Sequence, residues 1–377
     1  MSENSSDTVN NIMYIIKNLK EDFIITFIYI VILIIIIVVL FYIYRLKNLE
    51  NKECTFLNKI YGNLDGHIRS LNPSDNACQY KLLDYYIKSA YNCCSSGSYK
   101  NDFVSLCALK NVLKQGVRGL DFEIYSINDK PIISTSTETS YYIKETFNYV
   151  DFGDALRTII NYAFSGSTAP NPTDPIIIHL RIKSNNQKIY TIMASLFETY
   201  DIYFLGKEFS FENQGQNLGL TNLLSLSGKI VVIVDRINTA FLENSKFVEY
   251  VNMTSDSIFM RALSYYDIQF TPDVSELVNY NKTAMSIAFP DKGPNPTNPN
   301  PLIIRESGCQ MIAMRYEHID IYLEENTLFF DSAGYAFVLK PARLRYVPVT
   351  NSNPTPQQTD LSYATRNFST DYYNFNI

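Results

Sequence analysis

The sequence contains no tryptophan and only three histidines, His67, His179 and His318. Because histidine is the side chain whose ordinary pKa lies nearest neutral pH, the chain has few candidates for acid–base catalysis. Basic residues are also scarce, with 32 Lys and Arg against 38 Asp and Glu and a formal net charge of −6. Binding nucleic acid without sequence preference requires a basic surface, so we exclude nucleic acid as a partner.

Cysteine spacing gives no sign of a metal site. None of the six cysteines forms the closely spaced pairs of a zinc site, and in a cytosolic setting we expect all of them to stay reduced. The 46% hydrophobic content is that of a globular protein. Abundant Tyr, Phe, Ile and Asn without Trp is typical of an AT-rich genome, such as that of a large DNA virus. The cysteines are Cys54, Cys78, Cys93, Cys94, Cys107 and Cys309.

One long apolar run lies near the N-terminus. From Phe23 to Tyr44 the chain has no charged residue, Gly or Pro, and as a helix this run would be about 33 Å long, enough to cross a bilayer core. It is longer than the apolar part of a signal peptide, and Arg45 follows it where small residues would mark a cleavage site. We predict an uncleaved transmembrane helix over 23–44; the alternative is a helix buried in a protein core.

The flanking charges indicate an orientation. Two lysines precede the run, and four basic residues follow it, so the positive-inside rule predicts that the C-terminal domain is cytosolic, at a cellular or a virion membrane. Asn252 and Asn281 begin N-glycosylation sequons, which would matter only if the domain were lumenal. The basic residues are Lys17, Lys20, Arg45, Lys47, Lys52 and Lys59.

Changes in composition divide the rest of the chain. Residues 1–22 form a short N-terminal segment, and residues 45–77, interrupted at Leu71-Asn72-Pro73, are predicted to be a stalk. A folded domain over 78–346 follows. The remaining residues, 347–377, are rich in Asn, Thr and Ser and are predicted to be a loosely held polar tail.

Short apolar runs alternate with helical patterns in the folded domain. Near-continuous Ile and Val, as in IVVIV and PIIIHL, are typical of strands buried on both faces of a parallel sheet. Helices are predicted over 104–114, 152–164 and 188–200. Eight strands in a domain of this size predict a (β/α)8 barrel, and an open doubly wound sheet is the alternative. The predicted strands are 85–89, 119–125, 131–134, 175–182, 229–234, 257–263, 283–289 and 311–316.

Several motifs carry a family resemblance. Two segments closely resemble the end of the second conserved box of eukaryotic phosphoinositide-specific phospholipases C. They are GCQMIAMRYE from Gly308, where the family reads GCQ-V-A-NFQ, and AGYAFVLKPARLR from Ala333, where the family reads GYVLKP-FLR. Two further segments are similar to parts of the first box: LKNVLKQGVRGLDFEIY from Leu109 and LSGKIVVIVD from Leu226. The resemblance covers residues 80–346 and implies a distorted TIM (β/α)8 barrel, with an X-like half over 78–235 and a Y-like half over 236–346.

The family's reaction needs residues that this chain lacks. Attack of the inositol 2-hydroxyl on the phosphodiester requires a general base, a general acid and a cation. The resemblance implies two histidines, and a calcium ion held by carboxylates and an asparagine. Tyr91 stands at the first histidine position, and Thr135 and Thr137 stand where the second histidine motif belongs. Asn92, the matching calcium-binding amide, is retained.

The implied metal site is only partly retained. Asp121 and Glu123 are two residues apart and share one face of a strand. Arg181 takes the place of a third carboxylate, and its charge would repel calcium. We expect Arg181 to lie between Asp121 and Glu123 as a bidentate partner; the alternative is that it faces solvent. No metal or other cofactor is therefore expected, except calcium if the protein is active.

The positions that would contact the inositol phosphate headgroup are degenerate too. Ile233 and Asp235 replace lysines, while Ile287 and Phe289 replace an arginine and a tyrosine. His179 shares a strand face with Arg181, so it is either a hydrogen-bonded core residue or a substitute base.

Three functions follow from these residues. The first is a membrane-anchored pseudoenzyme of the phospholipase C type that serves as a structural or protein-interaction module, with an unknown protein partner. The second is an active phosphoric diester hydrolase with a rearranged site. The third is a membrane module that binds anionic lipid.

Overall fold

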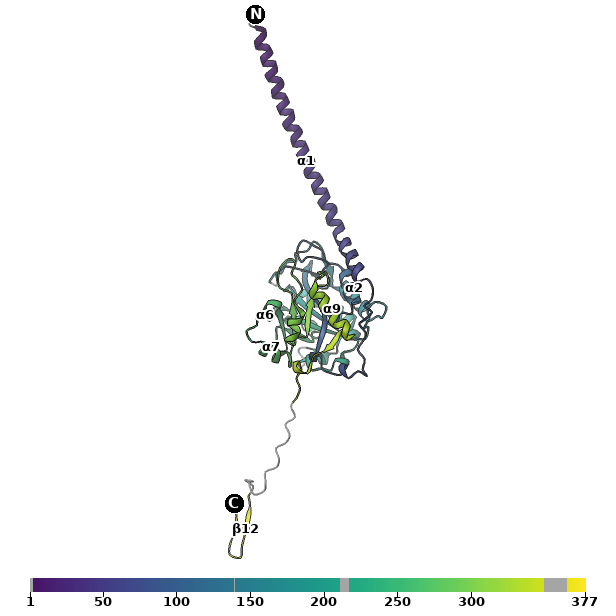
Figure 1. Ribbon diagram of the computed structural model, residues 1–377, viewed down its shortest axis with the longest axis vertical. Helices are drawn as coiled ribbons and strands as arrows, with labels where there is room; N and C mark the ends of the chain where they lie inside the picture. Colours follow the sequence, from purple (N-terminus) through teal and green to yellow (C-terminus); the bar gives the residue numbers. More distant parts are fainter. Residues whose placement is uncertain (1–2, 139, 211–216, 349–364) are drawn as a thin grey trace. The chain divides into compact units, whose positions relative to one another are not determined.

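A computed structural model describes residues 3–138, 140–210, 217–348 and 365–377. Within these residues, eight parallel strands form a barrel whose hydrogen-bonded order is β7-β6-β5-β2-β1-β10-β9-β8 (Figure 1). The two ends of this order, β7 and β8, contact each other without forming a ladder, so the barrel is nearly closed. The strands are β1 Tyr85–Ala90, β2 Gly119–Ile127, β5 Ile176–Ile182, β6 Ile230–Asp235, β7 Met253–Ser255, β8 Met260–Ser264, β9 Met285–Phe289 and β10 Met311–Met314.

The predicted fold class, a distorted TIM-type barrel after an apolar N-terminal helix, is confirmed. Every residue of β5 and β6 is buried, as expected for Ile- and Val-rich strands covered on both faces. One of the predicted strands lies outside the barrel, and one barrel strand was not predicted. The predicted strand at 131–134, β3 Lys130–Ser134, pairs antiparallel with β2 as a hairpin outside the barrel. The barrel strand β7 was missed because three residues are too few to show a periodicity.

Helices surround the barrel, and their starts follow from capping residues. Ser105, Asp151 and Asn186 accept backbone N–H groups at the first turns of α2, α3 and α4. Two short strands, β4 Val150–Asp151 and β11 Phe337–Leu339, pair with β3 and β1. The helices are α2 Leu106–Lys114, α3 Phe152–Ala163, α4 Gln187–Thr199, α5 Ser245–Val248, α6 Tyr265–Gln269, α7 Val274–Asn281, α8 Pro301–Glu306 and α9 Ile321–Ala333.

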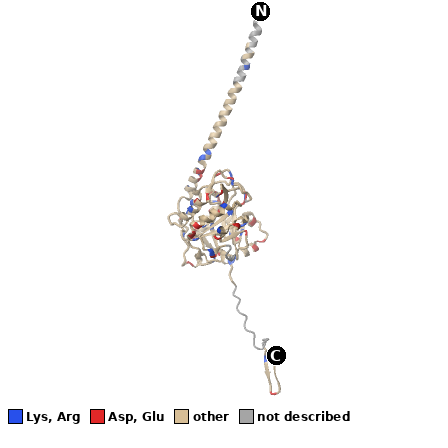
Figure 2. Cartoon of the chain, turned by 180° about the vertical axis from the view of Figure 1, so that it is seen from behind, with Lys and Arg blue, Asp and Glu red and all other residues tan. Residues whose placement is uncertain are grey.

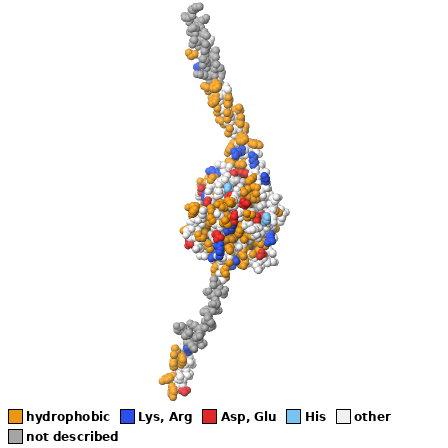
Figure 3. All heavy atoms as spheres, in the orientation of Figure 1, with side chains coloured by type: hydrophobic (Ala, Val, Ile, Leu, Met, Phe, Trp, Pro, Cys, Tyr) orange, Lys and Arg blue, Asp and Glu red, His pale blue; other side chains and the backbone are white. Residues whose placement is uncertain are grey.

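The apolar run lies within a much longer helix, α1 Glu3–Tyr61. From Phe23 to Tyr44 its apolar side chains are all exposed, and Figure 3 shows them along the visible face of the helix. This part of α1 is long and apolar enough to cross a membrane. Basic residues follow the apolar stretch in Figure 2, and the helix then continues without a break through the first half of the segment predicted as a stalk.

The expectation that all cysteines are reduced is wrong for two of them. Cys54 of α1 and Cys107 of α2 form a disulfide. The spacing of 53 residues gave no sequence signal, because the pairing depends on how α1 packs against α2. The other four cysteines are free and buried.

The chain divides into two compact units, residues 1–345 and 346–377. In the second unit, β12 Asn367–Ser369 and β13 Asn374–Asn376 form an antiparallel hairpin. This hairpin was not predicted for the polar tail. Residues 349–364 of that tail lie outside the described part of the chain.

Candidate functional site

The candidate site lies at the mouth of the barrel, which we define as the end where the parallel strands have their carboxyl ends. Tyr91 and Asn92 directly follow β1, and Asn92 adopts a left-handed backbone conformation with φ 43°. In the register of β2 with β5, Asp121 lies opposite His179 and Glu123 lies opposite Arg181. Alternation along the strands turns the four side chains to one face, and all of them are buried.

Arg181 is the centre of this group. Its Nε donates to Asp121 Oδ1 at 3.0 Å and its Nη2 donates to Asp121 Oδ2 at 2.6 Å, a bidentate pair. Its Nη1 donates to Glu123, and Nη2 also donates to Asn92 Oδ1 at 2.9 Å. The guanidinium therefore occupies the space between both carboxylates, as the sequence spacing predicted, and it does not face solvent.

Electrostatics favour the ionised carboxylate at Asp121. Burial works to raise its pKa, but the Arg181 charge and the hydrogen bonds from His179 and Arg181 lower it to about 2. Burial works to lower the pKa of Arg181, but the charges of Asp121 and Glu123 raise it above its ordinary value. The pair is thus fully charged over the physiological pH range, and neither partner is available to transfer a proton.

Two aromatic rings cover the guanidinium. The Arg181 Cζ atom lies 4.6 Å from the ring centre of Tyr91 and 5.2 Å from that of Phe289. The two rings contact each other, with centres 5.4 Å apart. Burial raises the pKa of the Tyr91 phenol above its ordinary value, so Tyr91 cannot replace the histidine as a base. The Tyr91 ring covers the guanidinium at the distance of a cation–π contact.

His179 forms a hydrogen-bonded array that the sequence did not reveal. Its Nδ1 lies 2.8 Å from Asp121 Oδ1 and its Nε2 lies 2.9 Å from the Ser255 hydroxyl. A serine, a histidine and a carboxylate in this order have the arrangement of an activated nucleophile. Ser255 was missed because it ends β7, the strand that was not predicted. All three side chains are buried, and Ser255 has no exposed surface for a substrate to reach.

The threonines at the second histidine motif are engaged elsewhere. The Thr135 hydroxyl donates to the Tyr99 carbonyl at 3.1 Å, and the Thr137 hydroxyl donates to Glu145 at 2.7 Å. The backbone of this segment reaches the site, where the Ser136 N–H donates to Glu123 at 3.0 Å. Neither threonine is placed to move a proton.

The headgroup positions form a surface that is apolar or acidic. Ile233 and Ile287 are fully buried, and Phe289 lies over Arg181. Asp235 caps the following turn by accepting the Ile237 N–H at 3.0 Å. Burial, together with the Asp235 charge, raises the pKa of neighbouring Asp256 to about 6. None of these four side chains supplies a positive charge to a phosphate group.

A small hollow lies at the mouth, beside the carboxylates. A cavity of about 190 Å³ lies beside Glu123 and is lined by Tyr91, Tyr99, Thr137 and Lys292, among others. Pockets that enclose small organic ligands usually have volumes of about 300 Å³ or more. The hollow beside Glu123, even with the space open to solvent included, is smaller than a pocket that encloses a ligand of that size.

The donor set does not fit a calcium ion. Calcium requires six to eight oxygen ligands, and three residues, Asn92, Asp121 and Glu123, turn oxygens toward one point here. Those oxygens already accept hydrogen bonds from a guanidinium that fills the same space. Both the charge and the volume of Arg181 therefore exclude a cation from this position.

Comparisons with known proteins agree with this architecture. The family model "Phosphatidylinositol-specific phospholipase C, X domain" matches residues 78–236, and the corresponding Y-domain model matches residues 238–343. A comparison with curated protein sequences gives no match.

Solved structures with a similar fold include two phospholipases named PLC21. The L. pealei structure has a TM-score of 0.58 and the S. officinalis structure 0.56, each with 19% identity over 71% of this chain. This chain spans only 38% of the length of either. A calcium-dependent phosphoinositol-specific phospholipase C from a Pseudomonas species has a TM-score of 0.47 and 10% identity, over 72% of this chain and 99% of its own.

Proposed function

This chain belongs to the phosphatidylinositol-specific phospholipase C family, and from its site we propose that it is a membrane-anchored pseudoenzyme whose barrel is a structural or protein-interaction module. Enzymes of the family are phosphoric diester hydrolases. The observation that carries the proposal is the position of Arg181, whose guanidinium fills the space between Asp121 and Glu123 where the family's metal ion would lie.

The proposed loss of activity rests on several independent changes. The buried phenol of Tyr91 cannot act as a base, and Thr135 and Thr137 donate to other groups. The Arg181 guanidinium is paired with two carboxylates, so it has little charge left to stabilise a developing phosphorane. Restoring one of these groups would leave the others missing, so a weakened version of the same reaction is not favoured.

One observation favours a second candidate. Ser255, His179 and Asp121 are hydrogen bonded in sequence, which is the arrangement that a rearranged hydrolase would use. Against this candidate, Ser255 is inaccessible and the Phe289 ring lies 5.5 Å from the His179 ring, between centres. We therefore interpret the array as a buried network that satisfies the polar groups under Arg181.

An assay of the full chain on vesicles tests the proposal. Vesicles that contain phosphatidylinositol, incubated with calcium, should release no inositol phosphate above the blank, and calorimetry should detect no calcium binding. A calcium-dependent bacterial enzyme of the family serves as the positive control. Hydrolysis that co-purifies with the chain would overturn the pseudoenzyme proposal. Loss of that hydrolysis in His179→Gln would assign it to the Ser255 array.

We propose that residues 23–44 anchor the chain in a bilayer. The flanking lysines favour a cytosolic barrel, but the Cys54–Cys107 disulfide is typical of an oxidising compartment. We give the disulfide more weight, because the difference in flanking charge is small, and we propose the oxidising side in place of the cytosol. The two sequon asparagines are buried, so the folded barrel presents neither for modification.

A further inference from the structure

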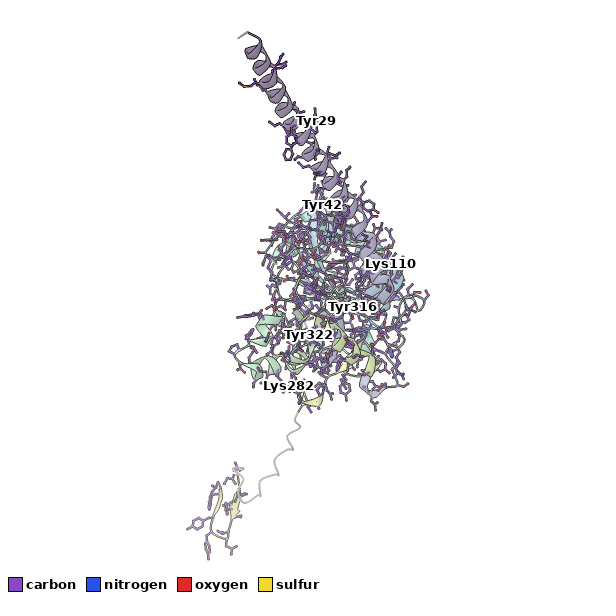
Figure 4. All side chains as sticks on the ribbon, turned by 45° about the horizontal axis from the view of Figure 1, so that its top comes forward. Tyr29, Tyr42, Lys110, Lys282, Tyr316 and Tyr322 are labelled. Atoms are coloured by element: carbon purple, nitrogen blue, oxygen red, sulfur yellow. A yellow bond between two sulfur atoms is a disulfide. The ribbon has the colours of Figure 1, made fainter. Side chains whose placement is uncertain are left out.

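The last turns of α1 lie along α2, and their contacts repeat at a nearly constant spacing. Cys54 is bonded to Cys107, the Asn111 amide donates to Asn58 Oδ1 at 2.9 Å, and both pairs are 53 residues apart. One turn further along, Lys114 Nζ donates to the Gly62 carbonyl at 2.7 Å. A constant spacing means that the two helices run side by side in the same direction. Figure 4 labels Lys110 on α2, the helix against which α1 lies.

The direction of α2 is fixed by its neighbours in the chain. β1 ends at Ala90 at the mouth, so the loop over 91–105 lies there and α2 begins there. α2 ends at Lys114, shortly before Gly119 starts β2 at the opposite end of the barrel. Because α1 runs parallel to α2, it also arrives at the mouth end. The membrane-spanning part of α1 therefore precedes the mouth, and not the opposite end of the barrel.

A polar contact at the mouth marks where α1 meets the barrel. The Ser96 hydroxyl in the loop after β1 donates to Glu53 Oε2 at 2.5 Å. Burial raises the pKa of Glu53 to about 8, so it is mostly protonated at neutral pH and is able to lie beside Asp102. One turn further, Leu57 is buried. We call this set of contacts, with the disulfide, the α1 clamp.

The clamp lies close to the apolar stretch. Glu53 lies nine helical steps after Tyr44, the last residue of that stretch, a distance of about 14 Å along the axis. The headgroup layer on one side of a bilayer is about 5–8 Å thick. A barrel held at Glu53 therefore has its mouth about 6–9 Å beyond the headgroup layer, a gap that a loop and its side chains at the mouth can span.

A loop beside the clamp exposes aromatic side chains. Residues 140–149, which we call the aromatic loop, are tied to the mouth by the Glu145 N–H, which donates to the Thr135 carbonyl at 3.0 Å, and by the Phe147 N–H, which donates to the Asp102 carbonyl at 2.8 Å. Asp102 belongs to the segment that contacts Glu53. The exposed apolar side chains of the loop are Tyr141, Tyr142, Ile143, Phe147 and Tyr149.

We infer that the α1 clamp holds the barrel with its mouth toward the bilayer and places the aromatic loop in the headgroup region. The inference rests on the membrane anchor of the proposed function. Tyrosine suits this layer, because its ring is apolar and its hydroxyl is polar. The loop's Lys144 and Glu145 have opposite charges, so the contact does not depend on anionic lipid. The partner surface is the bilayer that contains α1.

Two matched positions allow a direct test. Ile143 in the aromatic loop is 79% exposed, and Ile202, before β6, is 78% exposed. Lys229 donates to the Ile202 carbonyl just before β6 begins, which places Ile202 at the end of the barrel opposite the mouth. β5 alone spans about 23 Å between the two ends. The four free native cysteines are buried, so an introduced surface cysteine is the preferred labelling site.

The experiment places a fluorophore on Ile143→Cys or on Ile202→Cys of the full chain in vesicles that contain a headgroup-level lipid quencher. We expect most of the emission at position 143 to be lost and the emission at position 202 to be unchanged. Equal quenching, or stronger quenching at position 202, overturns the inferred orientation. Flotation of the vesicles beforehand tests the anchor separately. A chain that does not float contradicts the anchor, whereas a floated chain without quenching at position 143 contradicts the orientation alone.

Discussion

Replacing Arg181 by alanine is expected to lower the free energy of unfolding by about 3–5 kcal/mol, the usual cost of breaking a buried ion pair by removing one partner. Asp121 and Glu123 are each only 1% exposed and would be left as buried, uncompensated charges. The rings of Tyr91 and Phe289 would also lose the group that they cover. Denaturant unfolding of the full chain, followed by the near-ultraviolet circular dichroism of its tyrosines, measures the change.

Arg343→Ala is the matched control for this prediction. Arg343 also pairs with a glutamate, Glu306, at 2.6 Å, but the two side chains are 57% and 70% exposed. An exposed pair of this kind contributes about 1 kcal/mol or less. Equal losses in the two variants would mean that Arg181 does not compensate the carboxylates, and the main support for the pseudoenzyme proposal would be removed.

Calcium provides a second readout on the same variants. In Arg181→Ala, the oxygens of Asn92, Asp121 and Glu123 would surround an empty space large enough for an ion. A ligand present at a hundred times its dissociation constant stabilises a protein by about 2.7 kcal/mol. We expect calcium to recover part of the lost stability in Arg181→Ala and to leave the native chain unchanged. Stabilisation of the native chain by calcium would contradict the role assigned to Arg181.

The sequence was sufficient to predict the core of the site because strand geometry is regular. Residues two apart share a face, so Asp121 with Glu123, and His179 with Arg181, could be paired once two neighbouring parallel strands were predicted. A cation placed among carboxylates has few low-energy alternatives to an ion pair. The barrel itself could be predicted from the order of several motifs, because each motif also matched the expected strand or helix.

Features that depend on contacts distant in sequence were not predicted. Ser255 reaches His179 across 76 residues, from a strand too short to have a recognisable pattern. The strand over 131–134 has the composition of a barrel strand, and only its short turn to β2 at Asn128 and Asp129, both with positive φ, shows that it is a hairpin. The segment after Tyr44 is polar enough to be a stalk, but it is helical because α2 provides a surface for it.

Removing the disulfide by combining Cys54→Ser with Cys107→Ser is expected to lower the free energy of unfolding by about 2–4 kcal/mol. The bond closes a segment of 53 residues, which limits the conformations of the unfolded chain. In the folded chain, the other contacts of the clamp are a few hydrogen bonds and the burial of Leu57. The same unfolding measurement, with and without a reducing agent, gives the size of the effect.

Reduction should lower the stability of the native chain to that of the double variant and should leave the double variant unchanged. An independent count of thiols in the denatured, unreduced native chain should give four, Cys78, Cys93, Cys94 and Cys309, from the six cysteines of the sequence. The same count, made on protein alkylated inside intact cells, tests the side of the membrane. Six alkylated cysteines would mean that the bond is absent in the cell. Because thiols stay reduced in the cytosol, the barrel would then be placed there, as the flanking lysines favour, and not in an oxidising compartment.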